Sequence, residues 1–215
     1  MAMMQENRHL EAYVLLDEIK SFKDVQYHMD TMLKSNPMLA LSVSQPGDIF
    51  KFGHYEQDGN VSNGKEDIEW IVLEVSGNKA LLLSKYVIDS QPYHSEYRVD
   101  NFKSSNIYSW LQSNFINNAF DSSERSNIVG EISIPSEDQK EQYNIDYKAE
   151  LTAVAQKNGE QYTVFYPETK HYWTWWLQQR SSNVKSVPLG NGYSTDDLDG
   201  KYGVRPIIWV NIGED

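Results

Sequence analysis

The side chains of this chain that could do chemistry are five histidines and an acidic loop near the C-terminal end. The histidines are His9, His28, His54, His94 and His171. No two of them have the spacing of a ligand pair on one helix or strand, and none stands in a metal-binding motif. The simpler interpretation makes each one a surface or strand-end residue, and a histidine site assembled only by folding stays an alternative.

The acidic loop offers oxygen ligands. Asp196, Asp197 and Asp199 stand directly before Gly200. Calcium takes about six to eight oxygens, so this loop could supply roughly half of a calcium shell. A solvated turn is the simpler interpretation, and calcium is kept as the alternative. We expect no other metal and no cofactor.

Several classes of site are excluded by what the sequence lacks. It contains no cysteine, which removes disulfides, zinc–thiolate sites and cysteine nucleophiles. It also has no Gly-x-Ser-x-Gly elbow and no glycine-rich phosphate loop. We therefore predict no catalytic residues, and an enzyme is the less favoured class.

Composition limits the partners. The 215 residues carry a formal charge of −12 and contain no basic stretch, so nucleic acids and anionic membrane surfaces are poor partners. No run of 18 apolar residues occurs, which predicts no membrane insertion. The N-terminal residues lack a signal-peptide pattern, so we expect a cytoplasmic protein. A surface or phage particle stays an alternative.

The N-terminal part is predicted to be helical over residues 5–35. Leu15, Phe22 and Met29 are seven residues apart and lie on one apolar stripe. This stripe either docks on the chain's own domain or joins copies of the chain into a homo-oligomer. Residues 36–47 contain prolines and glycine and are predicted to be a linker. Residues 1–44 are therefore predicted to be an N-terminal helical extension and linker.

The main domain is predicted to span residues 45–215. Residues 68–75 and 79–88 are rich in β-forming side chains and are separated by a short Gly-containing turn, which indicates a hairpin. Residues 80–83 are continuously apolar, which predicts a central strand covered on both faces.

Helices are predicted to follow this hairpin. They cover residues 104–118, two short segments that begin with capping boxes after Asp121 and Ser136, and residues 147–157. The chain then returns to β-structure from residue 161. Strands, then helices, then strands predict an α+β fold with antiparallel sheets and flanking helices.

The C-terminal part places one arginine among large apolar side chains. Arg205 follows Gly203-Val204, and Trp175 and Trp176 lie upstream of it. A buried arginine needs a partner, so we predict a structural guanidinium held by a carboxylate and by backbone carbonyls. Because neighbouring strand residues alternate, Trp175 and Trp176 face opposite ways, and one of these faces could form an aromatic platform. Trp70, Trp110 and Trp175 are predicted to be structural.

Several motifs, in this order, resemble a bacterial family of domains of unknown function over about residues 45–213. They are Gly47-Asp48-Ile49, Phe52-Gly53-His54-Tyr55-Glu56-Gln57-Asp58, Ile68-Glu69-Trp70-Ile71-Val72-Leu73, Ala80-Leu81-Leu82-Leu83-Ser84-Lys85-Tyr86, Gln91-Pro92-Tyr93, Trp110-Leu111-Gln112-Ser113-Asn114-Phe115, Ala119-Phe120, Trp175-Trp176-Leu177 and Gly203-Val204-Arg205-Pro206. The family continues Trp-Trp-Leu with Arg-Ser-Pro-Gly, whereas this chain has Gln178-Gln179-Arg180-Ser181, which changes the expected local turn.

The resemblance implies a C-type-lectin-like fold, related to formylglycine-generating, sulfatase-modifying proteins and to the variable proteins of diversity-generating retroelements. By this likeness the loop 181–201 faces a protein or glycan ligand in a non-enzymatic recognition domain. The implied ligand-binding residues are Asn183, Lys185, Asn191, Tyr193, Thr195, Asp196, Asp197 and Trp176. Two alternatives stay open, a metal-dependent enzyme on the same scaffold and a structural or assembly subunit.

Overall fold

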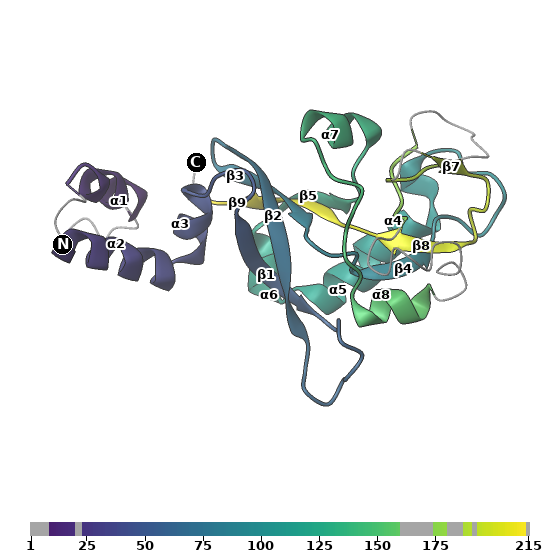
Figure 1. Ribbon diagram of the computed structural model, residues 1–215, viewed down its shortest axis with the longest axis horizontal. Coiled ribbons are helices and arrows are strands. Elements are labelled where there is room, and N and C mark those ends of the chain that lie inside the picture. The colour runs from purple at the N-terminus through teal and green to yellow at the C-terminus, as the bar shows by residue number, and fades with distance from the viewer. Residues whose placement is uncertain (1–8, 20–22, 160–173, 180–186, 191–192, 214–215) are drawn as a thin grey trace.

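The computed structural model describes residues 9–19, 23–159, 174–179, 187–190 and 193–213. Its fold is mixed α+β, with several helices around one larger antiparallel sheet (Figure 1). The elements are α1 (His9–Asp17), α2 (Lys23–Ser35), α3 (Pro37–Ser42), β1 (Ile49–Tyr55), β2 (Glu66–Ser76), β3 (Lys79–Ser84), β4 (Asp89–Pro92), η2 (Phe102–Ser104), α4 (Asn106–Trp110), η3 (Leu111–Phe115), α5 (Ile116–Ala119), α6 (Ser122–Ser126), β5 (Ile128–Ser133), α7 (Glu137–Gln142), α8 (Ala153–Asn158), β6 (Val187–Pro188), β7 (Ser194–Thr195), β8 (Lys201–Val204) and β9 (Ile207–Asn211).

The main sheet has five antiparallel strands in the order β1-β2-β3-β9-β5, so β3 is central. The predicted hairpin is confirmed as β2 and β3, which pair from Trp70–Ser84 to Ser76–Lys79. Two smaller ribbons, β4 with β8 and β6 with β7, lie outside this sheet.

Alternating side chains of β3 enter two different cores. Ala80 and Leu82 pack in the larger core, which includes Phe115 on the helical side. Leu81 and Leu83 pack in a second core, which includes Trp175. The period of two that separates the faces of a strand thus gives the sheet an apolar layer on each side. The predicted central strand, covered on both faces, is confirmed.

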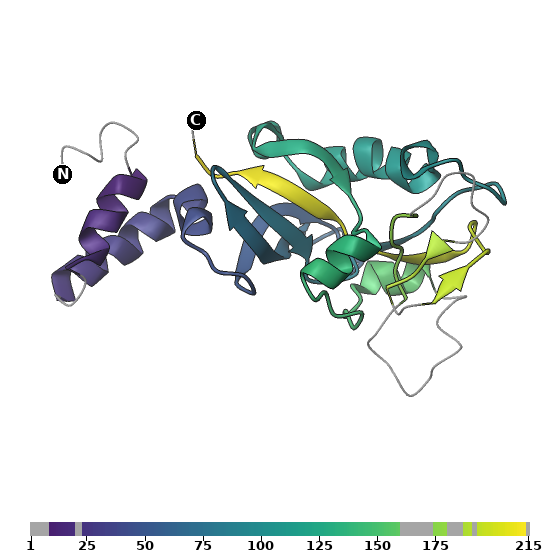
Figure 2. The same cartoon turned by 90° about the horizontal axis from the view of Figure 1, so that it is seen from above.

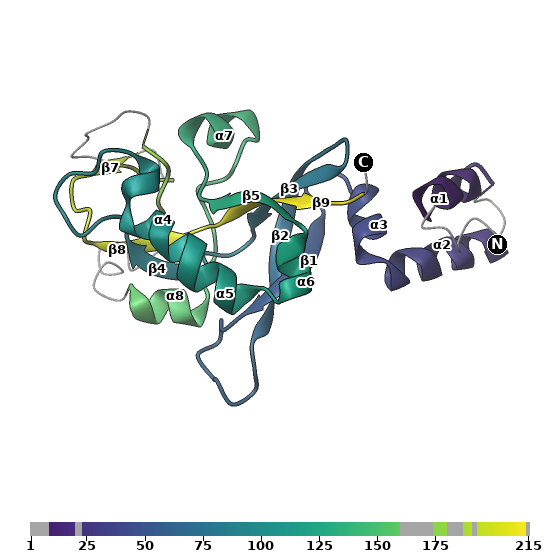
Figure 3. The same ribbon diagram turned by 180° about the vertical axis from the view of Figure 1, so that it is seen from behind.

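The helical stretch that covers the larger core was predicted over residues 104–118. It is formed by α4, η3 and α5, which follow one another without a break, and η3 is a π-helical turn. Figure 3, seen from behind, shows α4 and α5 lying across the sheet. Both predicted capping boxes are present, at Asp121–Glu124 and Ser136–Gln139.

The predicted helix at 147–157 is shorter in the structure. α8 begins at Ala153, because the hydroxyl of Thr152 accepts a hydrogen bond from the amide of Ala155 and caps the helix there. The preceding residues are not helical, and Leu151 forms a β-bridge with Val87. The β-structure predicted from residue 161 falls partly on residues 160–173, which lie outside the described ranges.

The N-terminal part differs from the single helix predicted over residues 5–35. It forms α1 and α2, which pack together through a small cluster that includes Ala12 and Met32. The predicted linker contains α3, because Pro37 suits a first helical turn and Asn36 caps it by accepting from the amide of Leu39.

The helical extension joins the domain through α3. Leu41 is fully buried in the larger core. Figure 2 shows α1 and α2 projecting beyond the sheet at that end of the molecule. Exposed apolar side chains remain on α1, including Leu10 and Val14. No helix within the described ranges has the length and apolar character needed to span a bilayer.

Near the C-terminus the chain passes from one ribbon to the main sheet. Trp175 forms a parallel bridge with Gly203, and Trp176 forms an antiparallel bridge with Leu189. β8 then pairs with β4, and Arg205-Pro206 leads into β9. The segment that contains Trp175 and Trp176 therefore lies beside β8.

The bulge in β1 places Gly53 where a larger residue should lower stability. The β1–β2 register shifts between Lys51 and His54, and Gly53 has φ +75° there. A Cβ on Gly53 would come 2.5 Å from the ring of Phe120, whereas one on Gly59, also at positive φ, meets nothing within 4 Å. We expect Gly53→Ala to lower the free energy of unfolding by about 3 kcal/mol, and Gly59→Ala by about 1 kcal/mol, in urea denaturation. Equal losses would contradict the packing described here.

Candidate functional site

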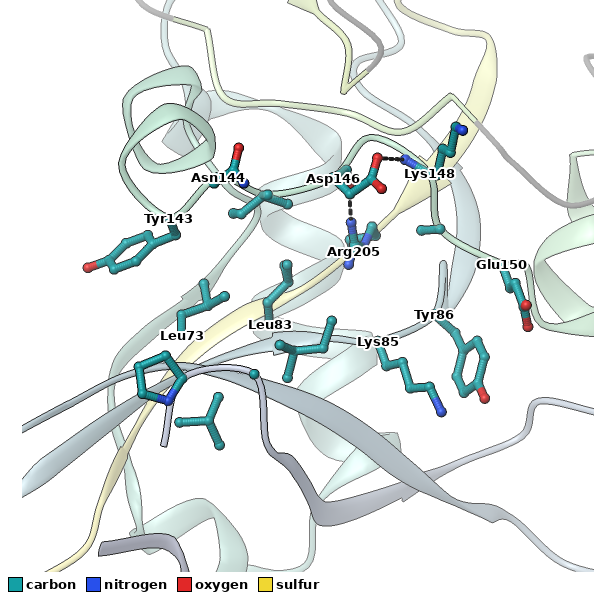
Figure 4. A pocket seen from close by; sticks show the side chains of 16 residues that line it. Leu73, Leu83, Lys85, Tyr86, Tyr143, Asn144, Asp146, Lys148, Glu150 and Arg205 are labelled. Atoms are coloured by element: carbon teal, nitrogen blue, oxygen red, sulfur yellow. Dashed lines mark hydrogen bonds between the residues drawn. The ribbon is translucent and has the colours of Figure 1, made fainter. Parts of the chain in front are cut away.

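A cavity of about 820 Å³ lies on the second-core face of the sheet. Its floor is apolar and comes from the hairpin strands, through Ile71, Leu73 and Leu83. Its opposite side is residues 143–150, called the wall segment here. Figure 4 shows Leu73 and Leu83 on one side of the cavity and Asn144, Asp146 and Lys148 on the other. We call this hollow the sheet cavity.

The direction of the wall segment is set at the end of α7. The amide of Ile145 donates to the carbonyl of Lys140 at 2.9 Å, and the amide of Asn144 donates to that of Glu141 at 3.2 Å. Asn144 has φ +48°, a left-handed conformation that asparagine tolerates better than most residues. These bonds form a Schellman motif, which turns the chain out of α7 and along the sheet.

Apolar contacts and polar bonds hold the wall segment on the body. Ile145 and Ala149 are buried in the second core. The phenol of Tyr143 donates to the carboxylate of Glu74 on β2. The indole Nε1 of Trp175 donates to the carbonyl of Tyr147 at 2.9 Å.

Arg205 makes a further bond to the wall. It is only 2% exposed, and its Nη1 donates to the carbonyl of Asp146 at 3.0 Å. Its Nε and Nη2 both donate to the carbonyl of Ser84 at the end of β3, at 3.3 and 3.1 Å. The guanidinium also lies over the ring of Trp175, with 5.0 Å to the centroid. One side chain thus joins the central strand, the wall segment and the tryptophan segment.

The charge of Arg205 is incompletely balanced. Burial lowers its pKa to about 10, and the nearby Asp146 charge opposes this change. Within the described ranges no carboxylate oxygen lies within 4.0 Å of the guanidinium. In this part of the chain the partners of Arg205 are carbonyl oxygens and an aromatic face, which are weaker partners for a buried charge than the carboxylate expected from the sequence.

Other charged groups stand at the rim of the sheet cavity. Lys85 Nζ pairs with Glu69 Oε2 at 2.6 Å and lies 4.8 Å from the centroid of the Tyr86 ring. The hydrogen bond to Glu69 is the main cause that raises the pKa of Lys85 above its ordinary value. Asp146 Oδ1 accepts from the amide of Lys148 at 2.9 Å. The site combines an apolar floor with positively and negatively charged side chains at its rim.

The C-terminal loop predicted to bind a ligand is described only in part. Asn183, Lys185 and Asn191 lie outside the described residues. Tyr193 is 73% exposed and Asp196 is also exposed.

The remaining loop residues are more enclosed. Thr195 and Asp197 are half-buried, and the hydroxyl of Thr195 accepts from the amide of Asp197 at 3.1 Å. Leu189 and Leu198 belong to the larger core, so parts of this loop are packed against the body.

Trp176 lies inside the protein. It is fully buried, its Nε1 donates to the carbonyl of Gln91 at 2.8 Å, and its ring packs edge-on against Tyr93 and Tyr202. A ligand at the surface does not reach this ring. Trp175 is also fully buried, on the opposite face of the sheet, so both faces of this segment are core.

Two further tryptophans also pack with other aromatic rings. Trp70 is fully buried, and its Nε1 donates to the carbonyl of Phe52 at 2.7 Å. Trp110 is half-buried and stacks on Phe115, with 5.5 Å between ring centroids.

A group of acidic side chains converges elsewhere in the described residues. Carboxylate oxygens of Glu56, Asp58 and Glu66 lie within 4.8 Å of one another, in the loop after β1 and at the start of β2. The calcium alternative, Asp196, Asp197 and Asp199, is not a convergent group of this kind. Exposed acidic groups are common without a metal, so this cluster carries no assignment.

No local sequence pattern predicts the sheet cavity. Lys85 and Tyr86 stand in one of the motifs of the family resemblance without a predicted role, and the helix predicted from residue 147 would include part of the wall segment. The one local signal was the tendency of Tyr-Asn-Ile after a capped helix to form a left-handed C-terminal turn.

The fold and the site define an α+β domain with a charged, apolar-floored cavity. Residues 77–152 match a family described as "Domain of unknown function (DUF6273)". This stretch includes β3, Lys85 and the whole wall segment. No curated protein and no solved structure matches the chain.

The bond between Tyr143 and Glu74 predicts a pH effect. Burial, then this hydrogen bond, raises the pKa of Tyr143 to about 12, above about 10 in an unfolded chain. Its stabilising contribution is therefore complete below pH 10 and is lost as the pH rises towards 12. We expect the stability difference between the wild type and Tyr143→Phe, from urea unfolding, to shrink over this window. The stability difference between the wild type and Glu74→Gln should shrink over the same window, because it depends on the same hydrogen bond. A stability difference that does not change with pH would contradict the assignment.

Proposed function

We propose that this chain contains a non-enzymatic recognition domain of C-type-lectin-like type, which binds a protein or glycan ligand in the sheet cavity. The observation that carries the proposal is the cavity itself, with Leu73 and Leu83 in its floor and Arg205 and Lys85 beside it. Its volume of about 820 Å³ lies within the range of about 300–1,000 Å³ that is common for ligand sites. An apolar floor with a few polar groups at the rim is the usual composition of such sites.

The state of the ionisable groups supports recognition rather than catalysis. Tyr143 donates to Glu74 and is held neutral, and Lys85 is held charged by Glu69. Arg205 is fixed by three hydrogen bonds to carbonyl oxygens. General acid–base catalysis needs groups with pKa values near the working pH, whereas these groups are fixed in one form, which suits the positioning of a ligand.

The lectin-like relationship is part of the proposal. Its support is the antiparallel sheet with helices α4 and α5 on one face, and the Gly203-Val204-Arg205 motif at the junction of β8 and β9. In this proposal Arg205 fixes the closing strand. Fold likeness alone does not give a ligand, so the cavity carries the functional argument.

The exposed end of the C-terminal loop contributes a second contact in this proposal. Tyr193 and Asp196 stand at the surface there, with Thr195 and Asp197 partly covered beside them. A rigid aromatic side chain with a polar end is suited to protein or glycan contact. The cavity stays the primary site.

An array experiment tests the proposal. The full chain, labelled with a fluorophore, is applied to immobilised glycans and peptides, and bound probes are titrated. Leu73→Trp fills the cavity floor, so we expect at least a tenfold loss of affinity for every bound probe. Val129→Trp is the matched control, because Val129 is 42% exposed on β5 of the same sheet and lies outside the cavity.

The control should bind as the wild type does. Equal binding by Leu73→Trp and the wild type would place the ligand elsewhere and contradict the proposal. Far-ultraviolet circular dichroism and thermal unfolding of both variants establish that the introduced indole leaves the fold intact.

A further inference from the structure

We propose that the sheet cavity recognises a carboxylate attached to an apolar group, as at the C-terminus of a peptide, and that Arg205 binds this carboxylate. The inference rests on the function proposed above and names the chemical class of its ligand. Two observations support it. The guanidinium of Arg205 is incompletely paired, and it lines the same cavity as the apolar floor.

The hydrogen bonds of Arg205 to described residues do not use all the N–H donors of its guanidinium. A guanidinium carries five N–H groups. Nε uses its one N–H on Ser84, and Nη1 and Nη2 each use one, on Asp146 and Ser84. Among the described residues, one N–H on each terminal nitrogen has no hydrogen-bond acceptor and can take one from a ligand. Two oxygens of one carboxylate match two N–H groups of an arginine better than any neutral acceptor does.

The electrostatic setting favours an anion at this place. Arg205 is 2% exposed and faces carbonyl dipoles and the Trp175 ring rather than an ion pair. A buried, unpaired cation is costly, and a bound carboxylate would remove much of that cost. The formal charge of −12 does not oppose this strongly, because charges farther away than about 8 Å are screened at physiological ionic strength.

The wall segment selects against more highly charged ligands. Asp146 and Glu150 both line the cavity, and Asp146 is near enough to Arg205 to act on its charge. A phosphate dianion would meet their charges as well as that of the arginine. A carboxylate balances the single charge of the guanidinium, whereas a phosphate dianion leaves one uncompensated negative charge in the cavity.

The floor decides what accompanies the carboxylate. Ile71, Leu73 and Leu83 present branched apolar side chains in the same cavity. An aliphatic side chain on the same carbon as the carboxylate can be buried there, whereas a sugar acid would bring hydroxyl groups onto this apolar surface. The pattern therefore favours the C-terminal residue of a peptide over an acidic glycan.

The inference is tested with two small probes on the full-length chain. N-acetyl-leucine has the carboxylate, and N-acetyl-leucinamide differs only by its neutral amide. We titrate each by isothermal calorimetry and follow the leucine and isoleucine methyl resonances by NMR. The acid should shift the Ile71, Leu73 and Leu83 methyl signals and bind at least tenfold more tightly than the amide.

Variants separate the carboxylate from the cavity. Arg205→Lys should lose most of the difference between acid and amide, because it loses the guanidinium fork. Since this change also affects packing, a second pair leaves Arg205 in place. Leu73→Glu adds a like charge beside the site and should weaken the acid at least tenfold relative to Leu73→Gln, which has the same size and no charge.

The possible results distinguish the carboxylate inference from the proposed recognition function. Equal binding of acid and amide in the cavity would overturn the carboxylate inference and leave the proposed recognition function standing. Tighter binding of glucuronate than of N-acetyl-leucine would also overturn it, in favour of an acidic glycan. Methyl shifts confined to residues outside the cavity would overturn it too. So would the absence of any shift with either probe at a concentration about 20 times a Kd of about 1 mM, which corresponds to about −4 kcal/mol.

Discussion

The hydrogen bonds of the Arg205 guanidinium are the interaction on which the rest of this site depends. They join the carbonyl at the end of β3 to the carbonyl of Asp146, and they place the charge over Trp175. Three segments distant in the sequence meet at this side chain. Because the guanidinium is buried, it needs these carbonyls as hydrogen-bond acceptors, and its bond to Asp146 ties the wall segment to the end of β3.

The geometry of the sheet explains why a cavity forms beside this junction. The larger core on the α4–α5 face is filled by aromatic rings, among them Trp70, Phe115 and Trp176. The opposite face is covered by the wall segment, α8 and Trp175, with smaller side chains such as Ala149 and Ala155. A single irregular segment covers a strand pair less completely than a helix does. The floor residues Ile71 and Leu73 are left half-covered, next to the charges of the rim.

Much of the fold could be predicted because its signals are local. The hairpin has its β-rich runs and turn, the capping boxes at Asp121 and Ser136 have their spacing, and the apolar run at residues 80–83 identifies the central strand. The helix break before α2 and the helix α3 are not predicted by the sequence. Pro37 is typical of linkers, and it begins a helical turn here because Asn36 caps that turn.

The site was less predictable because it depends on distant contacts. The sequence indicates that Arg205 needs a buried partner but not that Asp146, 59 positions away, supplies a carbonyl instead of its carboxylate. Exposure of a loop also cannot be inferred from polarity alone. The residues around Asp197 are polar, yet Leu198 beside it is buried in the core. Trp176 has the side chain of a binding platform and the position of a core residue.

Hydrogen–deuterium exchange of Arg205→Lys, compared with the wild type, tests most directly whether this guanidinium fixes the wall of the cavity. Lysine keeps the charge and the reach but cannot bond both carbonyls as the planar fork does. The account predicts that amides of residues 145–149 exchange at least tenfold faster, while the β2–β3 hairpin keeps its protection. Unchanged exchange in residues 145–149, or an equal increase throughout the domain, would contradict it.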